Sequence, residues 1–190
     1  MKTAVLVHGM PSREEYLDPN IPAASNNQWF PWLQKQFALK GVVAQTPEMP
    51  EPYKPNYEAW KKTFEQFEVD EDTILIGHSC GGGFLVRWLS ENKARVGKVV
   101  LVAPWINPND NDISPGFFDF QIDPNLADRT KGFYLLISSD DGQEELDTAK
   151  MLEEKIHDIQ VIRFTDKGHF CIGFNLKTEE FPELLKICRD

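Results

Sequence analysis

The sequence contains few cysteines, no long apolar run and no cluster of basic residues. Its 190 residues include three cysteines, Cys80, Cys171 and Cys188. An odd number without paired spacing does not describe a disulfide framework, so reduced thiols and a cytoplasmic location are expected. The N-terminal apolar run is too short for a signal peptide, and no stretch approaches the roughly 20 residues of a membrane-spanning helix.

Positive charge is also scarce. Lys and Arg together number 20 against 30 Asp and Glu, which gives a formal net charge of −10. Such an acidic chain favours neither nucleic acid nor anionic membranes, so neither is expected as a partner. Hydrophobic residues make up 41% of the chain, which is enough for the core of a single domain spanning 1–190.

Short apolar runs alternate with segments of helical periodicity along the chain. Strands are predicted at 3–7, 42–46, 73–77, 98–103, 133–138 and 159–164. Helices are predicted at 27–40, 57–67, 80–91, 143–157 and 178–188. Strands separated by helices pair in parallel through right-handed crossovers. The sequence therefore predicts an α/β fold, a three-layer α/β/α sandwich with about six mostly parallel strands.

Two connections between the predicted elements are long. One covers residues 10–26 and the other residues 104–131. Both leave the carboxyl end of a strand, where an open α/β sheet places its ligand crevice, so we expect both to line or cap the active site. The second carries Trp105, Phe117 and Phe118, which can either line an apolar substrate pocket or pack the connection onto the domain.

The most specific motif is Gly-x-Ser-x-Gly at residues 77–81, which follows the apolar run 73–76 and precedes a predicted helix. A serine on a sharp strand-to-helix turn leaves little room for neighbouring Cβ atoms, hence the flanking glycines. The turn exposes the hydroxyl, and the helix points its free N–H groups toward the same place. Ser79 is therefore the predicted nucleophile. A thiol nucleophile at Cys80 is the alternative, although the turn would direct it away.

Three consecutive glycines, Gly81, Gly82 and Gly83, stand in the first turn of that predicted helix. Each costs a helix roughly 1 kcal/mol relative to alanine. We therefore expect the backbones of the helix and a neighbouring strand to approach closely at the turn.

A serine hydroxyl needs a histidine to accept its proton and a carboxylate to orient that histidine. In one large fold group the order along the chain is serine, acid, histidine. Two of the four histidines precede the serine, and His157 lies inside a predicted helix. His169 follows the last predicted strand on a loop where Gly168 allows a tight turn. His169 is therefore the predicted base.

The acid is expected after the fifth predicted strand, where Asp140 and Asp141 stand. Alternate residues of an extended segment face opposite ways, so both cannot point at His169 equally well. We favour Asp141, with Asp140 as the alternative and Asp166, three residues before His169, as a further rival.

The reaction also needs hydrogen-bond donors for the negative charge that develops on the substrate oxygen. One is expected to be the backbone N–H of Cys80 at the helix start. The second should come from the loop after the first strand, and because Pro11 has no N–H, Met10 is the predicted donor. His8 and Gly9 of this loop are expected to lie beside the substrate. No Cys, His, Asp and Glu residues show metal-ligand spacing, so no metal or other cofactor is expected.

These residues resemble a known group, the α/β-hydrolases, and more narrowly the small single-domain serine hydrolases of the YdeN and retinoblastoma-binding-protein-nine family. The resemblance runs nearly end to end and includes segments 29–32, 49–52, 76–79, 100–103, 139–141 and 164–170. In that family the second aspartate of the Asp-Asp pair is the triad acid, which implies Asp141. The family usually continues with a proline and an apolar stretch, whereas this chain has Gly-Gln-Glu-Glu at 142–145.

Together these features predict a serine hydrolase that cleaves a small carboxylic ester, or an amide or thioester, through Ser79, His169 and Asp141. Two alternatives remain. One is a protein-interaction module that kept the fold, although a pure binding module does not need all three side chains. The other is a lyase or acyltransferase that uses the same three residues, which a buried site for a second substrate would favour.

Overall fold

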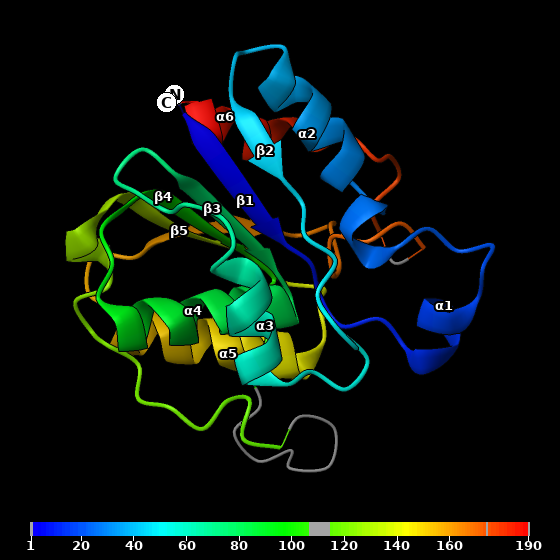
Figure 1. The fold of residues 1–190 in the computed structure, drawn as a ribbon. Coiled ribbons are helices and arrows are strands. Elements are labelled where there is room, and N and C mark those ends of the chain that lie inside the picture. The colour runs from blue at the N-terminus through cyan, green and yellow to red at the C-terminus, as the bar shows by residue number, and fades with distance from the viewer. Residues whose placement is uncertain (1, 107–114, 174, 190) are drawn as a thin grey trace.

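The fold is organised around one twisted sheet of six parallel strands, in the order β2-β1-β3-β4-β5-β6 (Figure 1). The computed structural model describes residues 2–106, 115–173 and 175–189. The strands are β1 (Thr3–Val7), β2 (Val43–Gln45), β3 (Ile74–His78), β4 (Val96–Val102), β5 (Thr130–Ser138) and β6 (Gln160–Phe164). The strand order reverses beside β1, so the carboxyl ends of β1 and β3 border the switch point where such sheets bind ligands.

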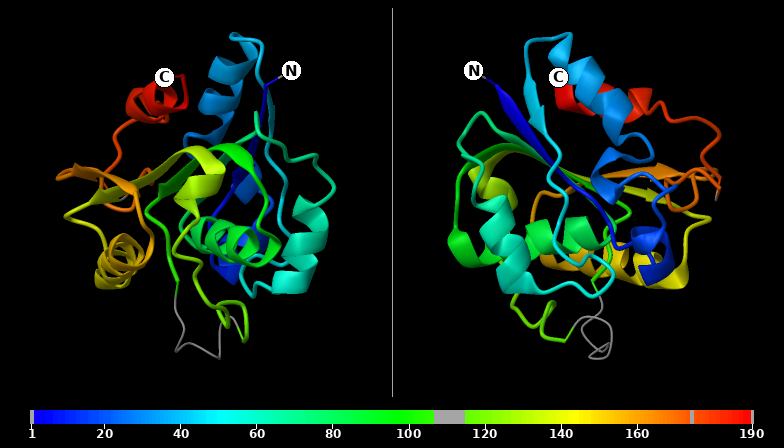
Figure 2. Two further views of the ribbon diagram at one scale, coloured as in Figure 1. Left: turned by 90° about the vertical axis from the view of Figure 1, so that its left-hand side faces the viewer. Right: turned by 45° about the vertical axis from the view of Figure 1, so that its right-hand side comes forward.

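Helices cover both faces of this sheet (Figure 2). One face carries α2 (Phe30–Ala38) and α6 (Pro182–Arg189). The other carries α3 (Tyr57–Phe64), α4 (Cys80–Asn92) and α5 (Gln143–Lys155). The predicted three-layer α/β/α architecture is therefore confirmed. No helix within the described ranges is long and apolar enough to cross a lipid bilayer.

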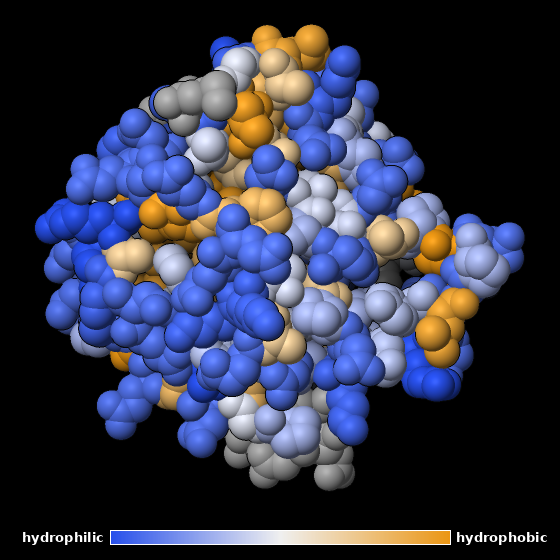
Figure 3. Space-filling view, in the orientation of Figure 1, coloured by the Kyte–Doolittle hydropathy of each residue, from blue (hydrophilic) through white to orange (hydrophobic). Residues whose placement is uncertain are grey.

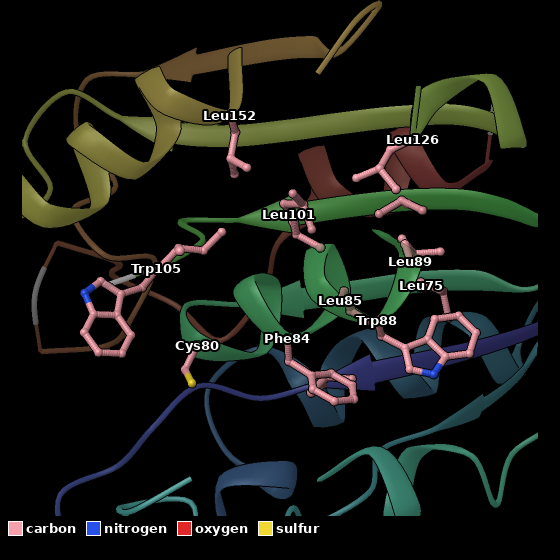
Figure 4. Packing of buried hydrophobic residues seen from close by; sticks show 14 of the residues in the cluster. Leu75, Cys80, Phe84, Leu85, Trp88, Leu89, Leu101, Trp105, Leu126 and Leu152 are labelled. Carbon is pink, nitrogen blue, oxygen red and sulfur yellow. The ribbon is translucent and has the colours of Figure 1, made fainter. Parts of the chain in front are cut away.

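The two faces of the sheet have separate hydrophobic clusters. Successive strand residues point to opposite faces, so Leu75 and Leu101 join the cluster under α3, α4 and α5, whereas Ile76 and Val100 join the one under α2 and α6. Figure 4 shows the first cluster, with Phe84 of α4 among its labelled side chains. Each such fully buried side chain stabilises the fold by roughly 1.5–3 kcal/mol.

The short helices in the connections were not expected from periodicity. They are α1 (Arg13–Leu17) and the 3-10 turns η1 (Ala24–Asn26) and η2 (Ala127–Arg129). None of the residues of α1 is buried, so it has no apolar stripe to reveal it. It is held at its start by a capping box, in which the Ser12 hydroxyl accepts from the Glu15 N–H at 3.1 Å and the Glu15 carboxylate accepts from the Ser12 N–H at 2.8 Å.

Candidate active site

Ser79 lies on the sharp turn between β3 and α4. Its φ is 52° and its ψ is −124°, a conformation that costs a non-glycine residue on the order of 1–3 kcal/mol. Neighbouring backbone holds the turn in place. The Ser79 N–H donates to the carbonyl oxygen of Val102 at 3.0 Å, and the Ser79 carbonyl oxygen accepts from the N–H of Trp105 at 3.0 Å. The end of β4 therefore fixes the backbone from which the hydroxyl projects.

Glycines allow three segments to meet at this turn. A Cβ on Gly77 would lie 2.6 Å from the carbonyl oxygen of Gly81, and a Cβ on Gly81 would lie 2.3 Å from that of Val7. A Cβ on Gly9 would lie 2.9 Å from the Cβ of Ser79. The expected close approach of helix and strand is confirmed, and it brings the loop after β1 against the serine.

His169 and Asp141 come from adjacent strand ends, beyond β6 and β5. The Nδ1 atom of His169 lies 3.1 Å from Oδ1 and 3.3 Å from Oδ2 of Asp141. The Asp141 side chain is only 2% exposed, and that of His169 is 20% exposed. A carboxylate in this position favours the tautomer with hydrogen on Nδ1, which leaves Nε2 able to accept a proton.

Asp140 makes a different set of contacts from its neighbour. Its Oδ1 accepts hydrogen bonds from the Ser138 hydroxyl at 2.5 Å and the Gly168 N–H at 3.0 Å, and its Oδ2 accepts from the Asn175 amide at 2.5 Å. The Ser138 hydrogen bond, followed by that from Gly168, lowers the pKa of Asp140. Asp140 therefore ties down the loop that carries His169, while Asp141 faces the imidazole ring.

His78 is a site residue that the sequence reasoning did not single out. Its Nε2 lies 2.9 Å from the carbonyl oxygen of His169, and because a carbonyl only accepts, Nε2 carries the hydrogen. The two rings lie 4.9 Å apart between centroids. Burial lowers the pKa of His78 to about 3, so the ring stays neutral near pH 7. His78 holds the backbone of His169 in place. Its position in the motif is variable, so the motif did not predict this contact.

A pocket of about 650 Å³ opens where Ser79 and His169 face solvent. The loop after β1 contributes His8, Gly9 and Met10 to its wall. The connection 10–26 contributes, among others, Glu15, Asp18, Tyr16, Ile21 and Pro22. Tyr16, Leu17 and Ile21 are exposed, and Figure 3 shows apolar atoms at the right-hand side, where Figure 1 draws α1. The first connection thus forms one wall of the pocket.

His8 is fixed in that wall as a neutral ring. Its Nδ1 donates to the carbonyl oxygen of Gly9 at 2.7 Å, and its Nε2 accepts from the N–H of Met49 at 2.9 Å. Burial lowers the pKa of His8, against the opposing effect of Glu48. Both ring nitrogens are engaged with backbone, so His8 positions the loop that also carries Met10.

Cys80 occupies the first position of α4. Its side chain is fully buried, and burial raises the pKa of the thiol, which leaves it protonated and unreactive. Its backbone N–H belongs to the first turn of the helix and has no intrahelical acceptor. The structure therefore presents the backbone of Cys80, and not its sulfur, beside Ser79.

The three aromatic residues of the second connection do not reach the pocket. Trp105, Phe117 and Phe118 are all buried in the cluster under α3, α4 and α5. Figure 4 labels Trp105 among the members of this cluster. The Phe117 ring stands edge-on to that of Trp60 at 5.1 Å. The expected substrate-binding role is therefore corrected to packing, because the rings of α3 and α4 offer a large apolar surface. Residues 107–114 of this connection lie outside the described residues.

The fold also brings a second carboxylate, that of Glu145, to the Asp141–His169 pair. One carboxylate oxygen each of Asp141 and Glu145 and one ring nitrogen of His169 lie within 4.8 Å of one another. Glu145 comes from the first turn of α5. Spacing along the chain did not reveal this metal-compatible set, because the histidine comes from a different strand end.

Known proteins are similar to this chain in sequence and in fold. The sequence profile of a family described as serine hydrolase matches residues 18–185. The hydrolase YdeN of Bacillus subtilis (strain 168) is 29% identical over 183 residues, covering 91% of each chain. The serine hydrolase RBBP9 of Rattus norvegicus is 24% identical over 170 residues, covering 85% of this chain and 84% of that protein. The crystal structure of the B. subtilis ydeN gene product matches with a TM-score of 0.79 and 26% identity, covering 98% of this chain and 96% of that one.

Proposed function

Because the chain belongs to the serine hydrolase family, we propose that it hydrolyses small carboxylic esters through Ser79, His169 and Asp141. One observation carries this proposal. Ser79 and His169 line the same pocket, and Asp141 lies 3.1 Å from the ring nitrogen Nδ1 of His169. This is the relation that a nucleophile, its base and an orienting carboxylate require.

The reaction proceeds in two halves. The Ser79 oxygen attacks the ester carbonyl carbon while its proton moves to Nε2 of His169, and the bond to the leaving oxygen then breaks as His169 returns that proton to the alcohol. Water next attacks the acyl carbon, and its proton passes through His169 to the Ser79 oxygen as the acid leaves. Asp141 stabilises the imidazolium formed in each half.

The backbone N–H groups of Cys80 and Met10 are the proposed donors to the developing oxyanion. Cys80 supplies a first-turn N–H directly after the nucleophile, and Met10 lines the pocket beside it. Each such donor is worth about 3 kcal/mol of transition-state stabilisation in comparable enzymes.

The pocket indicates a small-molecule substrate. Its volume of about 650 Å³ lies within the range of small-ligand sites. Apolar side chains such as Ile21 and Phe30 line part of it, and Glu15, Asp18 and Glu48 line other parts. An anionic acyl group would be repelled by these carboxylates, so uncharged acyl groups are favoured.

Hydrolysis of p-nitrophenyl acetate tests the proposal. The variants Ser79→Ala and His169→Ala should each reduce kcat by about 10⁶-fold with an unchanged circular dichroism spectrum. His157→Ala is the matched control, because His157 is exposed in the turn that follows α5. A Ser79→Ala variant that turns over the ester at the rate of the wild type contradicts the proposal.

The two aspartates can be separated in the same assay. Asp141→Asn should reduce kcat by about 10⁴-fold, because the amide favours the wrong tautomer of the histidine. Asp140→Asn should have a smaller effect, because Asp140 acts only on the loop. A larger loss for Asp140→Asn would reassign the acid.

A further inference from the structure

A second hollow of about 430 Å³ lies on the acid side of His169. Three carboxylates line it, those of Asp140, Asp141 and Glu145, and the described residues around it include no Lys or Arg. Asp140 is engaged with the loop, as described above. The charges of Asp141 and Glu145 thus converge beside one imidazole, with no permanent cation in the lining to balance them.

The position of Glu145 depends on the glycine at 142. A Cβ on Gly142 would lie 2.4 Å from Oε2 of Glu145. The backbone of Gly142, with φ of −62° and ψ of 153°, suits any L-amino acid, so its conformation does not require glycine. What the missing Cβ provides is room for the Glu145 carboxylate to fold back toward Asp141 and His169.

We propose that a divalent transition-metal ion such as Zn²⁺ binds Asp141, Glu145 and Nδ1 of His169, and that this binding switches the enzyme off. One oxygen from each carboxylate and the ring nitrogen already lie within 4.8 Å of one another. We assign Nδ1 as the ligand atom because this ring nitrogen lies 3.1 Å from Asp141. Small side-chain rotations bring the three atoms to the Zn²⁺ ligand distance of about 2.0–2.2 Å.

The switch is a change of tautomer at His169. In the active enzyme Nδ1 carries the hydrogen and Nε2 accepts the proton of Ser79. A metal ion on Nδ1 takes the lone pair of that nitrogen, so the ring hydrogen moves through solvent to Nε2. An Nε2 that already carries hydrogen cannot accept the serine proton. The inhibitory half of this inference rests on the proposed hydrolase function, whereas metal binding does not.

The donor set also predicts which ions bind. One imidazole nitrogen with two carboxylates suits Zn²⁺ and its neighbours in the transition series. Mg²⁺ prefers oxygen ligands and retains its water, so it should not compete at the same concentration.

Isothermal titration calorimetry of zinc chloride into the chelator-treated Ser79→Ala protein tests the site. One Zn²⁺ should bind per chain, and Glu145→Gln in that background should weaken binding by at least about tenfold. Gly142→Ala should weaken it similarly by displacing Glu145. Glu154→Gln, an exposed position on the same helix, is the matched control and should bind as the parent does. Unchanged affinity in both Glu145→Gln and Gly142→Ala would overturn the site and place any bound ion elsewhere, such as at the Cys171 thiol.

The wild-type ester assay tests the switch. Zn²⁺ should inhibit by at least about tenfold at concentrations that saturate the calorimetric site, EDTA should restore the rate, and Mg²⁺ should have no effect. Binding without inhibition would overturn the switch. Glu145-dependent binding in a protein without any esterase activity would support the metal site and refute the proposed function, so the two failures are distinguishable.

Discussion

The two long connections look alike in the sequence but do different work in the structure. The connection 10–26 contains α1, which has no buried residue, and it forms a wall of the pocket beside Ser79. The connection that starts at Pro104 places Phe117 and Phe118 inside the core. The connections leave the carboxyl ends of β1 and β4, which flank β3 in the sheet. The first lines the pocket, whereas the second packs against α3 and α4.

The difference teaches that an aromatic side chain in a loop goes to the nearest available apolar surface. Phe117 contacts the rings of Tyr57, Trp60 and Phe84, which project from α3 and α4. The first connection instead borders the pocket, whose wall includes the buried His8 and His78. Substitutions in the two connections should therefore separate stability from catalysis.

The largest effect on the free energy of unfolding is expected from a substitution at Phe117. Phe117→Ala removes a fully buried ring and should lower the free energy of unfolding by about 3–5 kcal/mol. Because the residue does not line the pocket, KM for p-nitrophenyl acetate should stay within about twofold. Urea unfolding and steady-state kinetics measure both quantities. Tyr16→Ala, in the exposed connection, should change stability by less than about 0.5 kcal/mol. A larger loss of stability in Tyr16→Ala than in Phe117→Ala would contradict the assignment of the second connection to the core.

As pH falls, the contribution of His8, next to the first connection, to the free energy of unfolding should be lost before that of Asp123 in the second connection. The pKa of His8 lies below its ordinary value of 6.5, so the folded state binds fewer protons there than the unfolded state does. The stability from this group is full above pH 6.5 and is lost as pH falls below it, by up to about 1.4 kcal/mol per pH unit.

Thermal unfolding between about pH 7 and about pH 5 measures this loss together with that of His78, whose pKa is lowered to about 3. His8→Gln, whose side-chain oxygen can still accept from the Met49 N–H, should reduce the slope, whereas His157→Gln should not. On the other side, the Lys93 hydrogen bond lowers the pKa of Asp123 from 3.8 to about 2, so that contribution is lost only as pH falls through this lower range. An equal slope for the wild type and His8→Gln would contradict the assignment.

A smaller effect on the free energy of unfolding is expected at Arg87, which holds the second connection in place. Its Nη1 donates to the carbonyl oxygens of Gly116 at 2.5 Å and Phe117 at 2.9 Å, and its guanidinium lies 3.6 Å from the centre of the Tyr57 ring. Lysine cannot reproduce the planar stacking, so Arg87→Lys should lower the free energy of unfolding by about 1–2 kcal/mol. Arg95→Lys, at an exposed position, is the control. Equal stability of the two variants would show that the contacts of Arg87 do not stabilise the fold.

The smallest effect on stability, and a selective one on kinetics, is expected at Ile21. This side chain is 39% exposed and lines the pocket. Ile21→Ser should raise KM for p-nitrophenyl hexanoate by roughly fivefold, equivalent to about 1 kcal/mol of apolar contact, and leave the acetate ester nearly unaffected. Leu39→Ser is the control, because Leu39 is 68% exposed and does not line the pocket. Equal effects on both esters would remove the first connection from the acyl-binding surface.

Local patterns were sufficient to predict much of this molecule. Continuous apolar runs predicted the buried parallel strands, and the motif at 77–81 predicted the turn at Ser79. The alternation of an extended segment predicts that only one of the two aspartates faces His169, and in the structure Asp141 lies beside the ring whereas Asp140 contacts the loop backbone.

Features that depend on tertiary contacts or on capping could not be predicted from local sequence patterns. The core position of Phe117 depends on rings of α3 and α4 that lie far from it in sequence. The hydrogen bond from His78 to the His169 backbone joins residues that are distant along the chain. The helix α1 is stabilised by capping at Ser12, without an apolar stripe that periodicity could detect.

The central claim is that Ser79 is an activated nucleophile, and covalent labelling tests it most directly. The wild-type protein is incubated with a fluorophosphonate probe, and the modified peptide is mapped by mass spectrometry. A single adduct on Ser79, absent in Ser79→Ala and strongly slowed in His169→Ala, is the predicted result. No adduct on the folded protein, while a known serine esterase in the same tube is labelled, or an adduct on another residue, would contradict the account.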